Sequence, residues 1–381
     1  MRIQGGQTLV GGQFVEADLT IDGDAGILST VGSNGGNGQC FDARGLYVLP
    51  GIVDIHADAF ERQLMPRPGV AFPIDVALME SDRQAVSNGI TTMFHGVTWS
   101  WEPGLRGADN ARAVLGAIET LRPQLGADTR CHLRLETFNL DAEAEVADWL
   151  GRGRIGMLGF NDHMPGEDAP PRTRKVTEMA ARAGLSDEDF LALVVRLRAR
   201  AGEVPESITR LAGAASASGT PSLSHDDMSP EQRRWFRALD CRVAEFPTTL
   251  ETAEDATHAG DDIVMGAPNV VRGGSYIGWI GAADMIARGF CTILASDYYY
   301  PAPLLAAFRL AADGVVPLNR AWAFVSERPA RAAGLADRGM LEAGSRADLI
   351  AVDGSDARRP KMVAAMAKGR FVHLADAGRL H

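Results

Sequence analysis

The stretch LPGIVDIHAD, residues 49–58, joins a short apolar run to a histidine and an aspartate. A run of this kind predicts a strand. Successive side chains of a strand point to opposite faces, so His56 and Asp58, two positions apart, share a face and can bind one ion together. Neither GxGxxG nor GxxxxGK[ST] follows the stretch, which disfavours the competing architecture, a doubly wound nucleotide-binding sheet.

Seven further apolar runs of the same kind follow, at residues 91–95, 131–136, 155–161, 221–225, 242–246, 262–267 and 291–295. Segments with apolar residues three and four positions apart predict helices between them, at residues 76–88, 108–122, 142–150, 187–200, 205–218, 229–239, 251–259 and 282–288. Eight strand-helix units of this size predict a TIM barrel, an α/β fold that usually needs about 250 residues. We place the barrel at residues 50–339.

The two ends of the chain have a different pattern. Residues 1–49 and 340–381 contain short β-like pieces separated by turns such as Gly11-Gly12 and Asp22-Gly23. We expect them to pair into one small β-sandwich domain. The proline-rich stretch at residues 165–172 predicts a long loop after the fourth barrel strand.

Composition limits the possible partners and the compartment. The 381 residues include 49 acidic and 38 basic side chains, and this net charge of -11 argues against binding to nucleic acid or to anionic membranes. No apolar stretch approaches the ~18 residues of a membrane span, and the N-terminus lacks the pattern of an export signal. The four cysteines form no CxxC pair, so we expect reduced thiols and a cytoplasmic protein. We expect a small-molecule substrate, and a homo-oligomer remains possible.

Metal-type ligands are concentrated at the ends of the predicted strands. They are His56 with Asp58, His95, Glu136, Asp162 with His163, His225 with Asp226 and Asp227, Glu245, Asn269 and Asp297. In a barrel all of these ends converge on one rim, so residues far apart in sequence can share one coordination sphere. Imidazole and carboxylate ligands suit Zn²⁺, Mn²⁺ or Fe²⁺. We expect one or two divalent ions, with zinc preferred.

Several motifs carry a resemblance to a known family. They are PGIVDIHADAFERQLMPRPGV (50–70), GITTMFHGV (89–97), SHDD (224–227), AEFPTTLETA (244–253), VMGAPNVVRGGS (264–275), SDYYYPAPLLAAF (296–308) and the returning AGSRADLIAVD (343–353). Together they resemble the amidohydrolase superfamily of metal-dependent hydrolases, and within it the triphosphate diphosphatases of the carbon-phosphorus lyase pathway. The resemblance implies that the protein hydrolyses a 5-triphosphate to a 5-phosphate and pyrophosphate.

Roles can be assigned on this basis. The expected metal ligands are His56, Asp58, Glu136, His163, His225 and Asp297, with Glu136 as the bridging carboxylate of a binuclear site. Asp297 is expected to carry a proton between the attacking water and the leaving group. Arginines beside Gly-rich and Pro-rich loops can bind phosphate oxygens through their guanidinium groups. The expected substrate contacts are Arg62, Arg67, His95, Arg272, Tyr276 and Tyr298, although His95 can equally be a core histidine.

Two departures from the family pattern leave alternatives open. Residues 276–279 are Tyr-Ile-Gly-Trp where the family commonly has His-Ser-Gly-Asn, and His95 stands where an acidic residue is usual. Bulky apolar groups near the substrate favour a second activity, deamination or hydrolysis of a cyclic amide with the same metal ligands. A third alternative is an inactive barrel that serves as a scaffold, which the ligands retained at five strand ends disfavour.

Overall fold

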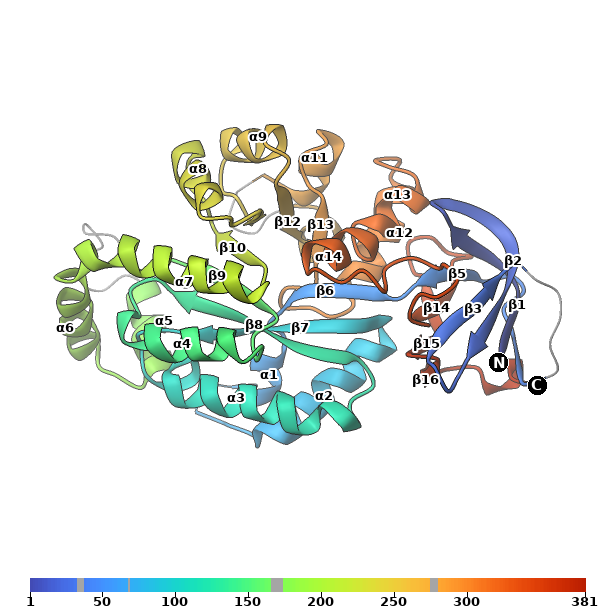
Figure 1. The fold of residues 1–381 in the computed structure, drawn as a ribbon, viewed down its shortest axis with the longest axis horizontal. Coiled ribbons are helices and arrows are strands. Elements are labelled where there is room, and N and C mark those ends of the chain that lie inside the picture. Colours follow the sequence, from blue (N-terminus) through green and yellow to red (C-terminus); the bar gives the residue numbers. More distant parts are fainter. Residues whose placement is uncertain (33–37, 68, 166–173, 275–279) are drawn as a thin grey trace.

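The computed structural model describes residues 1–32, 38–67, 69–165, 174–274 and 280–381. Eight parallel strands form the barrel sheet in chain order (Figure 1). They are β6 (Ile52–Ala57), β7 (Ile90–Trp99), β8 (Asp128–Glu136), β9 (Met157–Asn161), β10 (Ser222–His225), β11 (Val243–Glu245), β12 (Asp262–Gly266) and β13 (Ile293–Ala295). The prediction of a TIM barrel is confirmed, and each predicted strand overlaps an observed one. These strands could be located because both of their faces are covered, which makes them nearly continuous apolar runs.

The barrel closes by different means at its two ends. At the carboxyl ends of the strands, Ala57 and Asp297 form a parallel bridge, and the Asp297 N–H donates to the His56 carbonyl at 2.9 Å. At the opposite end a segment lies between β6 and β13, because Val53 N–H donates to Val325 O and Leu294 N–H donates to Phe324 O. The strands that begin and end the sheet therefore meet directly only at the rim where the predicted ligands lie.

Helices cover the outside of the barrel (Figure 1). Those that the sequence predicted are α2 (Ile74–Ser87), α3 (Ala108–Leu121), α4 (Glu143–Gly151), α6 (Asp187–Arg198), α7 (Val204–Ser218), α8 (Pro230–Ala238), α9 (Leu250–His258) and α11 (Ala282–Ala287). Those that it missed are α1 (Phe60–Leu64), α5 (Arg174–Ala183), α10 (Ala267–Arg272), α12 (Ala302–Ala312), α13 (Leu318–Ala323) and α14 (Glu327–Ala332). Several of these are a single turn or little more. The longer α12 is apolar on most sides and buried, so it lacks the polar face that produces a helical period.

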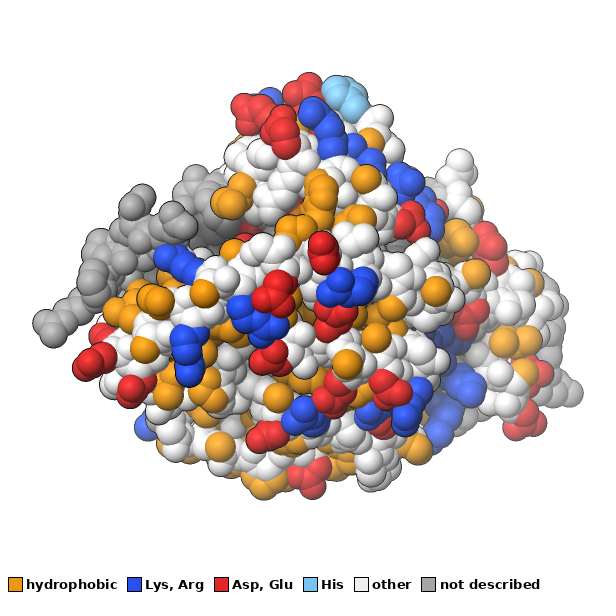
Figure 2. Space-filling model, turned by 60° about the vertical axis from the view of Figure 1, so that its left-hand side comes forward, with side chains coloured by type: hydrophobic (Ala, Val, Ile, Leu, Met, Phe, Trp, Pro, Cys, Tyr) orange, Lys and Arg blue, Asp and Glu red, His pale blue; other side chains and the backbone are white. Residues whose placement is uncertain are grey.

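Short 3-10 helices complete the connections, at Gly104–Arg106, Arg122–Gln124, Leu140–Ala142, Ala201–Glu203 and Ala377–Arg379. The long loop predicted at residues 165–172 lies outside the described residues except for Pro165. Among the described helices none has the length and apolar character needed to cross a bilayer. On the face shown in Figure 2, acidic and basic side chains are interspersed rather than gathered by sign.

Both ends of the chain build a second sheet beside the barrel (Figure 1). Its strands are β1 (Arg2–Val10), β2 (Gln13–Asp22), β3 (Ile27–Val31), β4 (Cys40–Asp42), β5 (Tyr47–Pro50), β14 (Leu349–Asp353), β15 (Lys361–Ala367) and β16 (Arg370–Leu374). The sheet splits at β1, which pairs with β4 near Ile3 and with β5 near Thr8. Both parts share a core that includes Leu19, Phe41 and Met366. The predicted domain from both termini is confirmed, and its β5 leads directly into β6.

Candidate metal centre

A pocket of about 230 Å³ opens at the carboxyl ends of the barrel strands. It is lined by His56, Asp58, Arg134, His163, His225, Asp226, Phe246, Pro247, Met265, Gly266, Asn269, Ile280 and Asp297. Five of the six side chains expected to bind metal are in this lining, and Glu136 is the exception. The barrel thus brings together residues that lie up to 241 positions apart, from His56 to Asp297.

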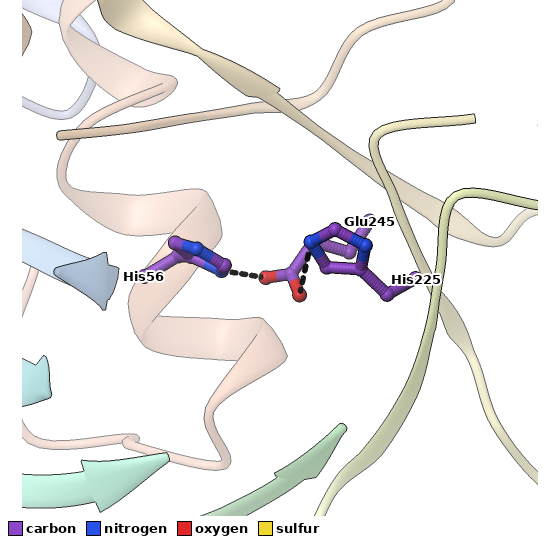
Figure 3. A group of neighbouring side chains, drawn as sticks. All are labelled: His56, His225 and Glu245. Carbon is purple, nitrogen blue, oxygen red and sulfur yellow. Dashed lines mark hydrogen bonds and ion pairs between the residues drawn. The ribbon is translucent and has the colours of Figure 1, made fainter. Parts of the chain in front are cut away.

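Glu245 lies between two of the histidines (Figure 3). Its Oε1 is 2.7 Å from His56 Nδ1, and its Oε2 is 4.0 Å from His225 Nε2. The carboxylate is fully buried, yet its pKa is lowered, because the nearby imidazoles of His56 and His132 outweigh the effect of burial. Glu245 is thus a buried anion placed between the ends of β6 and β10.

His163 enters the pocket from the segment after β9. Its Nδ1 lies 2.5 Å from Glu136 Oε1, its backbone N–H donates to Glu136 Oε2 at 3.0 Å, and its Nε2 lies 3.6 Å from Asp226 Oδ2. Burial disfavours a charged imidazole, but the carboxylates of Asp226 and Glu136 prevail and raise the pKa of His163 to about 9. Both oxygens of Glu136 are thus directed at His163, an arrangement that orients the imidazole.

Asp58 and Asp297 form the side of the pocket where the barrel closes. Asp58 Oδ2 lies 4.0 Å from His56 Nε2. Burial, together with the negative charge of Asp58, raises the pKa of Asp297 to about 7. A carboxyl group with this pKa can both accept and donate a proton near neutral pH.

The backbone is strained at this rim. Asp226, Phe246 and Asp297 have left-handed conformations, with φ of 58°, 56° and 55°. Each comes within two residues of the end of a barrel strand. This conformation costs non-glycine residues about 1–3 kcal/mol and clusters at functional sites. The turns bring both aspartates to the pocket and place the Phe246 ring 5.1 Å from the His56 ring.

The donor set fits divalent metal. Among the described residues, three groups have ligand atoms within 4.8 Å of one another: His56 with His225 and Glu245, His163 with His225 and Asp226, and His56 with Asp58 and Asp297. The first group shares His225 with the second and His56 with the third, so they form a continuous set across the pocket. Glu245 Oε2 is buried and has no hydrogen-bond partner in the part of the chain that the structure describes, a costly state that coordination would relieve. Carboxylate and imidazole together suit the transition metals expected from the sequence.

Three residues of this site were missed as site residues although the sequence carried a signal for them. Asp226 and Glu245 were noted as acidic residues at strand ends but were not assigned a role. Arg134 lies on β8 between His132 and Glu136, and these three residues alternate with Leu133 and Leu135, so they share the inner face of the barrel. That period of two could have identified Arg134. Its Nη1 lies 3.3 Å from Asp58 Oδ2 and its Nη2 lies 3.3 Å from His225 Nε2.

The expected substrate contacts lie elsewhere. The Arg62 guanidinium is 5.5 Å from the centre of the Tyr298 ring, and Arg272 Nη1 is 3.4 Å from the Tyr298 hydroxyl. These three residues therefore form one cluster, but none of them lines the pocket described above. Arg67 is exposed beside the turn to Val70, and Tyr276 lies outside the described residues.

His95 is a buried histidine on β7. It has no exposed surface, packs against Phe60 with ring centres 4.9 Å apart, and has no hydrogen-bond partner on either ring nitrogen. Burial lowers its pKa to about 4, so the imidazole is neutral at physiological pH. Because His95 does not line the pocket, its surroundings are those of a core residue.

Comparisons with known proteins agree with this geometry. Residues 247–378 match the amidohydrolase family. The chain is 33% identical over 326 residues to the alpha-D-ribose 1-methylphosphonate 5-triphosphate diphosphatase of Escherichia coli K12, which covers 82% of this chain and 84% of that protein. It is 24% identical to a dihydroorotase of Streptococcus thermophilus over 187 residues, 48% of this chain and 38% of that one.

Solved structures have the same fold. A prolidase complexed with N-methylphosphonate-L-proline superposes with a TM-score of 0.65 at 14% identity, covering 98% of this chain and 99% of that one. A D-hydantoinase superposes with a TM-score of 0.63 at 12% identity, covering 98% and 95%. From the extended similarity to the Escherichia coli protein and the family match, the chain belongs to the amidohydrolase family of metal-dependent hydrolases.

Proposed function

We propose that this protein hydrolyses a phosphoanhydride of a small phosphorylated molecule, of the ribose 5-triphosphate type, and releases pyrophosphate. The observation that carries the reaction type is the continuous set of metal-binding side chains beside a carboxyl group that can exchange a proton, Asp297. The substrate class rests on the 33% identity to the diphosphatase across most of both chains.

In this proposal His56, His225 and Glu245 hold one divalent ion, and Asp58, His163, Asp226 and Asp297 complete the site or hold a second ion. Zinc is the proposed metal, with manganese and iron as alternatives. The bound metal would polarise a phosphoryl oxygen and lower the pKa of water. Glu136 orients His163 in this proposal and does not bridge two ions, because both of its carboxylate oxygens face that residue.

Asp297 is the proposed proton carrier. It receives a proton from the attacking water and returns it to the oxygen of the leaving pyrophosphate. Its place supports this role, since its backbone forms the bridge that closes the barrel and its side chain lines the pocket. A carboxyl group fixed in this way needs little rearrangement during proton transfer.

The distal phosphates need positive charge. The cluster of Arg62, Arg272 and Tyr298 could contact them, since guanidinium groups bind phosphate oxygens in a bidentate manner. We keep Arg67 as a further candidate. We also propose a cytoplasmic location, because all four cysteines are free thiols, three of them buried.

A second candidate activity is hydrolysis of a C–N bond in a cyclic amide or related heterocycle. One observation favours it: Phe246, Pro247, Met265 and Ile280 form an apolar wall in the pocket, which suits a neutral ring. The partial similarity to a dihydroorotase is consistent with this alternative.

One experiment separates the two activities. The purified protein, loaded with zinc or manganese, is incubated with ribose 5-triphosphates and, separately, with dihydroorotate and other cyclic amides. We expect pyrophosphate in the first series and neither ammonia nor ring opening in the second. Turnover of cyclic amides without pyrophosphate release would replace the first proposal by the second. Metal analysis that finds no bound metal and no effect of added metal would contradict both.

A further inference from the structure

Arg134 is a buried cation in the wall of the candidate active site. Its side chain is 7% exposed and comes from the inner face of β8. Of the described residues that line the pocket, it is the only lysine or arginine. The mechanism proposed above leaves this residue without a task.

Arg134 lies beside Gly96 of β7. A Cβ atom at Gly96 would lie 3.1 Å from Arg134 Cδ, tighter than most packing contacts. A side chain at residue 96 would therefore require the arginine stem to shift slightly, and glycine spares it that shift.

The guanidinium is only partly satisfied. Among the described residues, Nη1 contacts Asp58 and Nη2 contacts His225, both at 3.3 Å, and the buried Nε has no hydrogen-bond partner. Arginine has five N–H donors in a planar fork, so most of this capacity is unused. A buried cation with unused donors is suited to bind an anion that enters the pocket.

Metal binding would leave Arg134 with still fewer partners. Its contact with His225 uses the Nε2 atom, and the other nitrogen, Nδ1, lies 3.1 Å from Asp226. An imidazole nitrogen has one lone pair, which cannot serve a metal and a guanidinium at the same time. If Nε2 of His225 binds metal, Nη2 of Arg134 must turn to another acceptor.

Charge also favours this use. Asp58, Asp226 and Asp297 line the pocket, and any of their carboxylates whose charge the metal does not offset would repel a phosphorylated substrate. Arg134 adds a fixed positive charge next to them, in a place where water is largely excluded. The planar fork matches two oxygens of one phosphoryl group, a geometry that a lysine cannot reproduce.

We propose that Arg134 binds the oxygens of the phosphoryl group that is attacked, and so selects an anionic over a neutral reacting centre. This inference rests on the proposed phosphoanhydride hydrolysis for its substrate. The general claim, that Arg134 is the pocket's receptor for a phosphate-like anion, can be tested without any turnover.

The test compares Arg134→Gln and Arg134→Lys with Arg130→Gln. Arg130 is on the same strand and pairs with Asp128 at 2.9 Å, outside the pocket, so it is a matched control. Each metal-loaded protein is titrated with inorganic phosphate by calorimetry, and bound metal is measured by elemental analysis. We expect phosphate affinity to fall about 10–100-fold in Arg134→Gln, as for a lost hydrogen bond to a charged group, less in Arg134→Lys, and not at all in Arg130→Gln.

Kinetics on the triphosphate substrate provide the second readout. We expect kcat/KM to fall in Arg134→Gln with metal content unchanged, and added guanidinium ion to restore part of it. Unchanged phosphate affinity in the metal-loaded variant would overturn the inference, whether or not its metal content falls. A wild-type protein that hydrolyses no triphosphate but loses phosphate binding with Arg134→Gln would refute the proposed function and retain this inference.

Discussion

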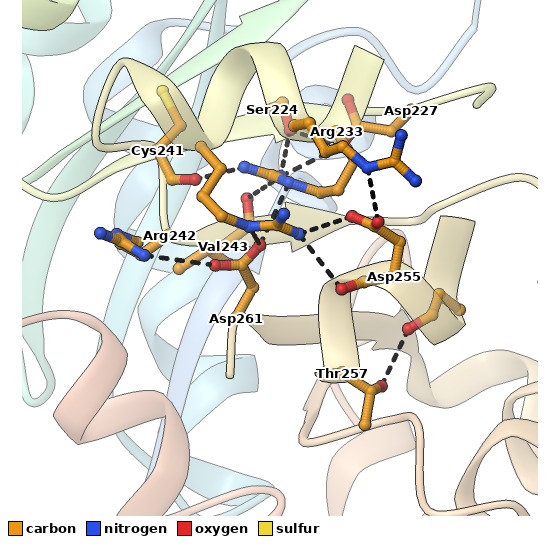
Figure 4. Close-up of polar contacts among 12 residues, drawn as sticks. Ser224, Asp227, Arg233, Cys241, Arg242, Val243, Asp255, Thr257 and Asp261 are labelled. Carbon is orange, nitrogen blue, oxygen red and sulfur yellow. Dashed lines mark hydrogen bonds and ion pairs between the residues drawn. The ribbon is translucent and has the colours of Figure 1, made fainter. Parts of the chain in front are cut away.

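Two clusters of buried charge lie near the ends of β10 and β11, and they differ in the partners that their carboxylates face. Around Arg233, which has no exposed surface, each charged side chain pairs with an opposite charge within 3.3 Å, although Asp227 Oδ1 and Asp261 Oδ1 have no hydrogen-bond partner among the described residues (Figure 4). Arg233 Nη1 donates to Ser224 Oγ at 2.6 Å and to Asp227 Oδ2 at 3.0 Å, its Nη2 donates to the Cys241 carbonyl, and its Nε forms an ion pair with Asp261 at 3.3 Å. Around Glu245, by contrast, the carboxylate faces two imidazoles, and its Oε2, 4.0 Å from His225 Nε2, has no hydrogen-bond partner among the described residues (Figure 3).

The neighbouring residues Asp226 and Asp227 show how close the two clusters are. Asp227 is fully buried and pairs with Arg233 of α8, whereas Asp226 takes a left-handed conformation and lines the pocket. Neither of them caps α8, whose N-cap is Ser229, with a side chain that accepts from Gln232 N–H. Carboxylates paired with a buried arginine stabilise the fold, whereas a carboxylate that faces imidazoles at a pocket remains available for metal.

The largest effect should come from Asp297→Asn. The amide cannot carry a proton, so we expect kcat to fall about 10²–10⁴-fold while the fold is retained. The check is the rate of pyrophosphate release together with bound metal per protein. Activity within a few-fold of wild type would remove Asp297 as the proton carrier.

Arg233→Met tests the ion-paired cluster around Arg233. Removing the guanidinium leaves Asp227 buried without its ion-pair partner, while Asp261 keeps its contact with Arg237 at 2.7 Å. The unpaired carboxylate should lower the free energy of unfolding by about 3–5 kcal/mol. Urea unfolding of the metal-loaded protein measures this loss. Ser224→Ala, which removes one hydroxyl from the same network, should cost about 1 kcal/mol.

The catalytic constants per folded molecule should be unchanged in Ser224→Ala and Arg233→Met. A changed KM in either variant would show that the Arg233 network and the pocket are not independent.

Glu245→Gln should weaken metal binding. The amide keeps the shape but not the charge between His56 and His225, so we expect metal affinity to fall at least about 10–100-fold. Competition with a chelator provides the measurement. Glu102→Gln is the matched control, because Glu102 is also a buried glutamate but pairs with Arg182 at 2.6 Å away from the site. Equal affinities in the two variants would contradict a role for Glu245 at the metal.

The smallest effect concerns the stability of the fold at acidic pH, which depends on another buried ion pair. Arg338 Nη1 lies 2.6 Å from Asp128 Oδ2 and joins the start of β8 to the segment that returns to the terminal sheet. Although burial opposes ionisation, hydrogen bonds from Arg130 and Arg338 lower the pKa of Asp128 to about 2. The unfolded chain has the ordinary value near ~3.9, so this stabilisation is fully present above pH ~4 and is lost as the pH falls towards 2.

We therefore expect Asp128→Asn to remove about 1 kcal/mol of the stability that the wild-type protein loses between pH 5 and 3, as measured by urea unfolding. A variant that keeps the wild-type slope of stability against pH in this range would show that Asp128 is not responsible for it.

Much of the fold could be predicted from the sequence for one physical reason. Parallel barrel strands are buried on both faces, so 52–57 and 90–99 appear as apolar runs whatever surrounds them. The same burial hid α12, because a helix covered on most sides has no polar face. The local pattern of apolar residues reveals a helix only where the faces of the helix differ in burial, and it reveals a strand also where the strand is buried along its whole length.

The sequence by itself also placed His56, Asp58, His163, His225 and Asp297 at strand ends, because a barrel gathers those ends at one rim. Only the tertiary structure decided which side chains touch there. It directs Glu136 at His163, places Glu245 between two imidazoles and brings Arg134 into the pocket. These contacts depend on the stagger of the strands and on left-handed turns at Asp226 and Asp297, which bring together residues that no local pattern relates.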